Sequence, residues 1–286
     1  MAILSKEQLA RFKQDGCLVI PDFFTSEKAQ ELKQRAEQLL TEFSLEGHPM
    51  TQFSTGTNDK KHVGDDYFLE SGDKIHYFFE EGAFDDKGNL KIPKERAINK
   101  IGHGLHILDP TFKEFSINDK ISSMTRELGF KSPQVLQSML IFKQPYIGGS
   151  VPSHQDSSFL YTEPVSAIGF WFALEDCTEQ NGCLWFVPGS HQYTPIVKRF
   201  VRNPHDSGTV FIGDDTNPPI DESKYVKCEV KVGSLVLIHG SVVHKSAPNF
   251  SENSRYIYTF HCIEGEAIYS KDNWLQPSDG TPFTFV

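Results

Sequence analysis

A series of short apolar segments in the second half of the chain constrains its fold more than any other feature. Glycine, proline and asparagine stand between these segments, and each segment has the length of a β-strand. Short strands at this spacing are typical of a closed or double-sheet jelly roll. The segments span residues 135–143, 168–174, 183–187, 226–232, 235–239 and 256–263.

The first half of the chain instead favours helices that can pack against such a sheet. Ser5 can cap a helix that ends at Gly16, because Gln8 three residues later completes a capping box. Short strands are predicted at 17–20 and 75–79, with a long exposed connection at 47–72. Further helices are predicted from Thr25 or Ser26 to about residue 43, over 93–106 with Lys100 on it, and over 118–128.

We therefore expect a mainly β protein with flanking helices. A length of 286 residues fits a single domain of this kind. Within residues 1–286 we expect helical support and a lid over 1–130, the jelly-roll core over 131–265, and a C-terminal tail over 266–286.

One short motif in the β-rich half carries side chains that bind metals. Alternate side chains of an extended segment point the same way, so His154 and Asp156 share a face. His244 follows another predicted strand, and a jelly roll brings such strand ends together at its mouth. Two histidines and one carboxylate form the facial triad of non-haem Fe(II) oxygenases, which leaves positions open for a co-substrate and O2. His239 and His261 compete with His244, but neither precedes an arginine at a suitable distance.

Composition and charge exclude several partners. The formal net charge of −10, with no long basic run, argues against nucleic acid or an anionic membrane. No window of about 18 apolar residues is present, so no membrane-spanning helix is predicted. The five cysteines lack C-x-x-C spacing and are expected to be reduced. We expect a cytoplasmic protein, since neither a signal peptide nor a C-terminal peroxisomal signal is recognised; oligomeric state is left open, with a monomer as the default.

Several motifs, in one order along the chain, together resemble a known family. They are His154-Gln155-Asp156, Asn181-Gly182-Cys183-Leu184, Pro188-Gly189-Ser190-His191, His244-Lys245-Ser246 and Arg255. In this order they resemble the phytanoyl-CoA dioxygenase family of 2-oxoglutarate-dependent oxygenases, over roughly residues 16–260.

The resemblance implies a double-stranded β-helix, the cupin-like form of the jelly roll, in which His154, Asp156 and His244 hold one Fe(II). It also implies that Arg255 pairs with the distal carboxylate of 2-oxoglutarate, which suits the planar fork of a guanidinium. Enzymes of this family use O2 to decarboxylate 2-oxoglutarate to succinate and CO2 and to hydroxylate a substrate. By similarity, the co-substrate pocket is also lined by Lys100, Met139, Trp171 and Ser246.

Two other functions fit the same residues. A cupin-like metalloenzyme, such as an isomerase or a hydrolase, would use another divalent metal without O2, and only an oxygenase would form succinate. A sensor would bind 2-oxoglutarate without a substrate and would not decarboxylate it. A halogenase is disfavoured, because similar halogenases lack the carboxylate that Asp156 supplies.

The substrate is expected to be a small organic molecule, and we predict that it is not a simple branched acyl-CoA. The phosphates of CoA usually need basic residues at the rim of a pocket, whereas this chain is acidic overall. Candidates for a small basic rim are Lys198, Arg199 and Arg202. Segments 51–79 and 194–221 are long and polar and are expected to supply the lid.

Overall fold

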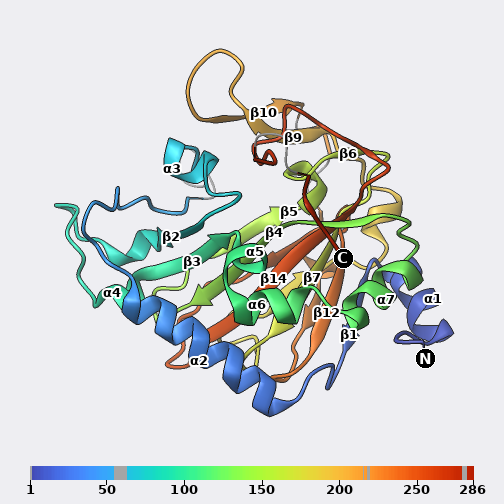
Figure 1. Ribbon diagram of the computed structural model, residues 1–286, viewed down its shortest axis with the longest axis horizontal. Helices are drawn as coiled ribbons and strands as arrows, with labels where there is room; N and C mark the ends of the chain where they lie inside the picture. Colours follow the sequence, from blue (N-terminus) through green and yellow to red (C-terminus); the bar gives the residue numbers. More distant parts are fainter. Residues whose placement is uncertain (1, 55–62, 215, 218–219, 279–281) are drawn as a thin grey trace.

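Two antiparallel sheets form the centre of the computed structural model, which describes residues 2–54, 63–214, 216–217, 220–278 and 282–286 (Figure 1). The larger sheet has the strand order β1-β12-β7-β14-β4-β3-β2, with β16 paired to β4, and the smaller has the order β11-β8-β13-β5. Side chains of both sheets meet in one apolar cluster that includes Trp171, Ile257 and Leu184. The predicted fold class, mainly β with a double-stranded β-helix, is confirmed.

Most strand bounds in the second half of the chain follow the predicted apolar segments closely; of segment 226–232, only residues 226–228 form a strand. The larger sheet contains β1 (Cys17–Ile20), β2 (Ile75–Phe79), β3 (Ile98–His103), β4 (Pro133–Lys143), β7 (Ile168–Ala173), β12 (Leu235–His239), β14 (Arg255–Glu264) and β16 (Thr284–Phe285). The smaller contains β5 (Val151–His154), β8 (Leu184–Phe186), β11 (Val226–Cys228) and β13 (His244–Ser246). Two short ribbons pair β9 (Lys198–Arg202) with β10 (Thr209–Gly213) and β6 (Thr162–Glu163) with β15 (Ile268–Tyr269).

Most helices from the first half of the chain lie along one side of the larger sheet (Figure 1). The first begins and ends as predicted, since Ser5 and Gln8 form a capping box and Gly16 ends the helix at φ 75°. The helices are α1 (Lys6–Asp15), α2 (Ser26–Glu42), α3 (Asp66–Leu69), α4 (Lys94–Ala97), α5 (Leu105–Leu108), α6 (Pro110–Ser116) and α7 (Asp119–Glu127), with 3-10 turns η1 (Glu81–Ala83), η2 (Asp156–Ser158), η3 (Ser190–Gln192) and η4 (Glu222–Lys224).

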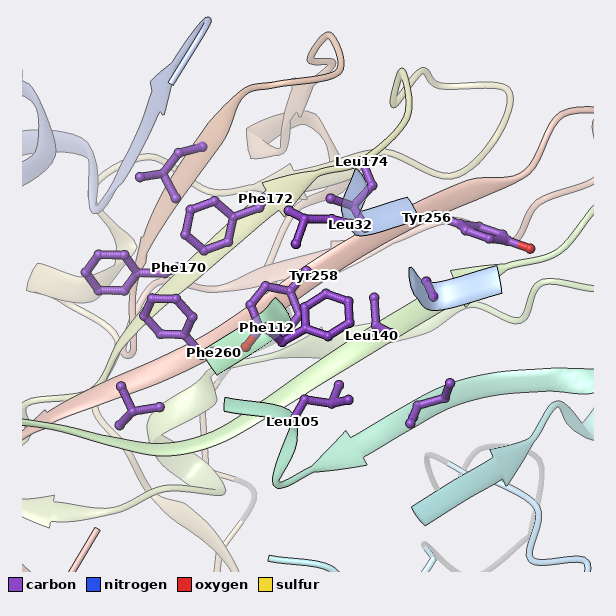
Figure 2. Packing of buried hydrophobic residues seen from close by; sticks show 14 of the residues in the cluster. Leu32, Leu105, Phe112, Leu140, Phe170, Phe172, Leu174, Tyr256, Tyr258 and Phe260 are labelled. Atoms are coloured by element: carbon purple, nitrogen blue, oxygen red, sulfur yellow. The ribbon is translucent and has the colours of Figure 1, made fainter. Parts of the chain in front are cut away.

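The central strands of the larger sheet, among them β7 and β14, are buried on both faces, and alternate side chains of β14 have different roles. On β14, Tyr258 and Phe260 point towards the helices, where Phe260 stacks on Phe170 at 4.9 Å between ring centroids (Figure 2). The alternate residues of the same strand, among them Arg255 and His261, point the other way and line a cavity between the sheets. The outward face therefore stabilises the fold, and the inward face is free to carry polar groups.

The helix predicted over 93–106 is wrong. Only α4 is helical in its first part, and the chain then extends as β3, which pairs with both β2 and β4. The apolar residues Ala97, Ile98, Ile101 and Leu105 have a spacing that suits a helix, and all four are buried. Pairing with the edge of β4 satisfies the backbone of β3, so tertiary context outweighs the local pattern.

The connection predicted at 47–72 is not exposed throughout. Residues 55–62 lie outside the described part of the chain, but Asp65 caps the short helix α3, and Phe68 on that helix is buried and stacks on Trp274 at 4.3 Å. Among the described residues, every helix is too short or too polar to cross a membrane.

Candidate metal centre and adjoining cavity

His154 and His244 lie directly opposite each other on the neighbouring strands β5 and β13. Their ring centroids are 4.2 Å apart. Gln155 keeps extended dihedral angles (φ −122°, ψ 127°), so Asp156 at the start of η2 stays on the same face as His154. Asp156 Oδ1 lies 3.4 Å from His154 Nε2 and 3.6 Å from His244 Nε2. The structure thus brings these three predicted residues together, with their ligand atoms within 4.8 Å of one another.

Backbone carbonyls fix which nitrogen of each imidazole faces Asp156. His154 Nδ1 lies 2.8 Å from the carbonyl oxygen of Pro152, and His244 Nδ1 lies 3.1 Å from that of Val242. A carbonyl only accepts, so each Nδ1 carries a proton, and in the neutral form of either ring the Nε2 lone pair points to the carboxylate. Three acceptor atoms then converge with no donor between them. Such a set of donor atoms fits a divalent cation, and the carbonyl contacts are those that orient metal-bound histidines.

Burial sets the protonation of the group. It lowers the pKa of His244 to about 4, helped by the neighbouring imidazole of His154, so His244 is neutral at pH 7. Burial alone would raise the pKa of Asp156, but the facing imidazoles of His244 and His261 hold it well below its usual range. A neutral imidazole and an ionised carboxylate are the forms that bind metals.

Gln155 anchors the His-x-Asp segment from behind. Its side chain points away from the two flanking residues, and its Nε2 donates to the carbonyl oxygens of Thr194, at 3.0 Å, and Ser241, at 2.8 Å. These bonds connect the His-x-Asp segment to the chain just after η3 and to the turn before His244. The middle residue of the motif therefore positions its neighbours.

A cavity of about 830 Å³ lies beside the triad, and Arg255 lies at its wall. Only 2% of Arg255 is exposed; its Nη1 donates to the carbonyl of Gly182 at 3.4 Å, and its guanidinium lies over Trp171 at 5.6 Å. Its Nε has no hydrogen-bond partner, and no acid of the described residues forms an ion pair with it. A buried cation with an unused N–H is a ready site for an anion.

The other residues predicted for the pocket also line this cavity. Ser246 lies two residues after His244 on the same face of β13, and Met139 faces the cavity from β4. Trp171 reaches it from β7, opposite Thr259 of β14. The four predicted pocket residues that accompany Arg255 are Lys100, Met139, Trp171 and Ser246.

Lys100 reaches the cavity from β3 and not from a helix. Its Nζ lies 3.3 Å from the ring centroid of Phe53. Burial lowers the pKa of Lys100 to about 7, and the partly compensating charge nearby is that of Glu80. The ammonium group is therefore easily deprotonated unless an anion enters the cavity.

His261 is the site residue whose role the sequence reasoning missed, because it was weighed only as a rival to His244. Its Nε2 lies 3.2 Å from Asp156 Oδ2, the oxygen that faces away from the other two imidazoles. The alternation of side chains along β14 could have indicated this role, since it places His261 on the same face of the strand as Arg255. His239 instead packs against Phe12 and His191, away from the triad.

Comparison with known proteins decides the family. The model of the family "Phytanoyl-CoA dioxygenase (PhyH)" matches residues 12–257. The chain belongs to the phytanoyl-CoA dioxygenase family. It is 47% identical to phytanoyl-CoA dioxygenase domain-containing protein 1 of Rattus norvegicus over 99% of this chain and 98% of the relative. It is 46% identical to the phytanoyl-CoA dioxygenase of Arabidopsis thaliana over 96% and 94% of the two chains.

A solved structure shares the fold. The epimerase SnoN, in complex with Fe3+, alpha ketoglutarate and nogalamycin RO, superposes with a TM-score of 0.64 at 16% identity, over 97% of this chain and 91% of SnoN. Family membership confirms the predicted class of enzyme. The chain is a 2-oxoglutarate-dependent dioxygenase, a class that takes Fe(II), with 2-oxoglutarate and O2 as co-substrates.

Proposed function

We propose that His154, Asp156 and His244 bind Fe(II) and that the enzyme hydroxylates a small organic substrate. The observation that carries this proposal is the convergence of three acceptor atoms, two of them on histidines whose other nitrogen is held by a carbonyl. When bound, Fe(II) supplies the redox chemistry that couples decarboxylation of 2-oxoglutarate to transfer of an oxygen atom to a C–H bond.

Arg255 binds the distal carboxylate of 2-oxoglutarate in this proposal. Its guanidinium is buried, lies in the same cavity as the triad and has an unused N–H. Lys100 and Ser246 donate to carboxylate oxygens of the co-substrate, which gives the buried ammonium group a counter-ion. Met139 and Trp171 pack against its carbon chain and exclude water.

The substrate is not a simple branched acyl-CoA in our proposal, because most of the basic rim is engaged within the protein. Arg202 donates to the carbonyl oxygens of Trp274 and Leu69, both at 2.8 Å. Arg199 lies over the ring of Tyr161 at 4.6 Å and 3.7 Å from a carboxylate oxygen of Asp272. These guanidinium groups tie the C-terminal segment to the β9 ribbon. A small molecule is also what the SnoN complex holds, as its ligand nogalamycin RO indicates.

We further propose that residues 1–286 act as one catalytic domain, with 131–265 as the core. The proposed lid consists of the described residues of segments 51–79 and 194–221 apart from strand β2, since Phe68 of the first and Thr194 of the second line the cavity. The 266–286 tail stabilises the larger sheet, because β16 pairs with β4.

The proposal is tested under anaerobic conditions with Fe(II) and 2-oxoglutarate. We expect a weak metal-to-ligand charge-transfer band in the wild-type protein and in the surface variant His205→Ala, and none in His154→Ala. In air, we expect slow formation of succinate without any substrate. A band that persists in His154→Ala overturns the assignment of the triad. Binding of 2-oxoglutarate without succinate would instead favour a sensor.

A screen of metabolite extracts for faster succinate release then identifies the substrate class. Mass spectrometry of the product separates hydroxylation, which adds one oxygen atom, from epimerisation, which leaves the mass unchanged. Hydroxylation of phytanoyl-CoA in equal amount to succinate would contradict the proposal that an acyl-CoA is not the substrate.

A further inference from the structure

Three residues form one row across neighbouring strands of the larger sheet, directly behind the proposed metal site. Gly169 of β7, His261 of β14 and Gln137 of β4 are cross-strand partners. His261 and Gln137 are both buried, with 7% and 5% of their surface exposed. Both line the cavity, so this row faces the smaller sheet, where Asp156 follows β5.

Along this row each hydrogen bond is donated towards Asp156, from Gln137 to His261 and from His261 to the carboxylate. A carboxylate can only accept, so the 3.2 Å contact between His261 Nε2 and Asp156 Oδ2 requires a proton on Nε2. In the neutral ring Nδ1 is then an acceptor, and the Nε2 amide group of Gln137 lies 3.4 Å from it. Gln137 thus fixes the tautomer of His261, and His261 donates to Asp156.

The glycine in the row leaves room for this pair. A Cβ at Gly169 would lie 3.3 Å from His261 Nε2 and 3.5 Å from Asp156 Oδ2. A side chain there would be tight against His261 Nε2 and in ordinary contact with Asp156 Oδ2. The absence of a side chain at Gly169 therefore leaves the His261–Asp156 contact undisturbed.

We infer that His261 is a positioning residue that holds Oδ2 of Asp156 and leaves only Oδ1 to the metal. This inference rests on the proposed function, because it assumes that the triad binds a metal. Its consequence concerns the number of open positions. A carboxylate that binds through both oxygens would take a position that a facial triad leaves to 2-oxoglutarate or O2. Gln137 acts one step further away, through His261.

The inference is tested with Co(II), a coloured probe that needs no turnover. His261→Leu removes the donor, and His261→Gln keeps an amide N–H near the position of Nε2. We expect the Kd for Co(II) to rise by about 10- to 100-fold in His261→Leu, the effect usual for residues that orient metal ligands. His261→Gln should recover most of the affinity. The Co(II) absorption spectrum should change in His261→Leu, since the carboxylate is free to bind through its second oxygen.

Two further variants complete the experiment. His239→Leu removes a half-buried histidine that does not contact Asp156 and should leave Co(II) binding and the spectrum unchanged. Gly169→Ala places a methyl group tight against His261 Nε2 without removing a polar group and should weaken Co(II) binding in the same direction, by less than His261→Leu. Circular dichroism on each variant shows whether it is folded.

The outcomes separate the inference from the proposed function. A wild-type protein that binds neither Co(II) nor Fe(II) with 2-oxoglutarate overturns the proposed metal site itself. Tight wild-type binding that His261→Leu leaves unaltered, in both affinity and spectrum, overturns the inference alone. If His261→Leu does not fold, His261→Phe, which keeps a ring but has no donor, takes its place, and unaltered Co(II) affinity and spectrum in that variant overturn the inference.

Discussion

Arg255 and His261 point to the same side of β14, Arg255 into the cavity between the sheets and His261 towards the carboxylate of Asp156. Alternation along the strand is intact between them, because the register shift of β14 comes after His261. Arg255 presents an unused N–H to the cavity, where we place the carboxylate of 2-oxoglutarate, and His261 contacts the carboxylate of Asp156. One strand of the larger sheet therefore supplies both Arg255 and His261, while the smaller sheet and the turn that follows β5 supply the proposed metal ligands.

His244→Ala should abolish the Fe(II)-dependent formation of succinate. The variant removes one of the three converging acceptor atoms, and a facial triad with two ligands does not hold the metal. His239→Ala is the matched control, because this histidine lies at the end of β12 and packs away from the triad. Succinate is measured by coupled assay or by NMR. Normal turnover in His244→Ala, or its loss in His239→Ala, would contradict the choice of His244.

Arg255→Met should weaken the binding of 2-oxoglutarate by about 10- to 100-fold, since a hydrogen bond to a charged group is worth roughly 1.5–3 kcal/mol. Arg255→Lys should recover only part of this affinity, because an ammonium group lacks the planar fork. In the absence of co-substrate, Arg255→Met should not lower the free energy of unfolding through loss of an ion pair, because the guanidinium has no acidic partner among the described residues. Calorimetric titration and thermal unfolding provide the two measurements.

The affinity for 2-oxoglutarate should fall as the pH rises above about 7. Burial lowers the pKa of Lys100 to about 7 in the free protein, and a bound carboxylate raises it again. Binding therefore takes up a proton above pH 7, and the affinity falls by at most about tenfold per pH unit until the pKa of the complex is reached. Below pH 7 the ammonium group is charged in both states, so no further gain is expected. Lys100→Met should bind more weakly and lose this pH dependence; equal slopes in the two proteins would rule out Lys100.

Phe260→Ala should lower the free energy of unfolding by about 3–5 kcal/mol, the usual loss for a fully buried phenylalanine. Phe260 is 0% exposed and stacks on Phe170, on the face of the sheet that the helices cover. Phe250→Ala is the control, because that ring is 72% exposed and its loss should change the free energy by less than about 0.5 kcal/mol. Urea unfolding measures both. A small effect of Phe260→Ala would mean that the outward face of β14 contributes little to the core.

The local sequence was sufficient to predict those elements whose determining interactions are short in range. The cap at Ser5 and the stop at Gly16 act within one turn, and both were placed correctly from the residues alone. Apolar runs such as 235–239 became strands because no alternative local structure competes for them. The alternation through Gln155 likewise placed His154 and Asp156 on one face, as expected.

The tertiary structure decided what depends on partners distant in sequence. Lys100 lies on a strand because β4 offered an unpaired edge, and a spacing of apolar residues that suits a helix cannot report the presence of that edge. Arg202 was a candidate for the rim until folding placed the carbonyls of Leu69 and Trp274 beside it. His261 faces Asp156 only because two sheets pack face to face. Residue type and spacing thus determined which chemistry is available, and the packing of distant strands decided which groups are free to perform it, because hydrogen bonds and burial are settled only when the partners meet.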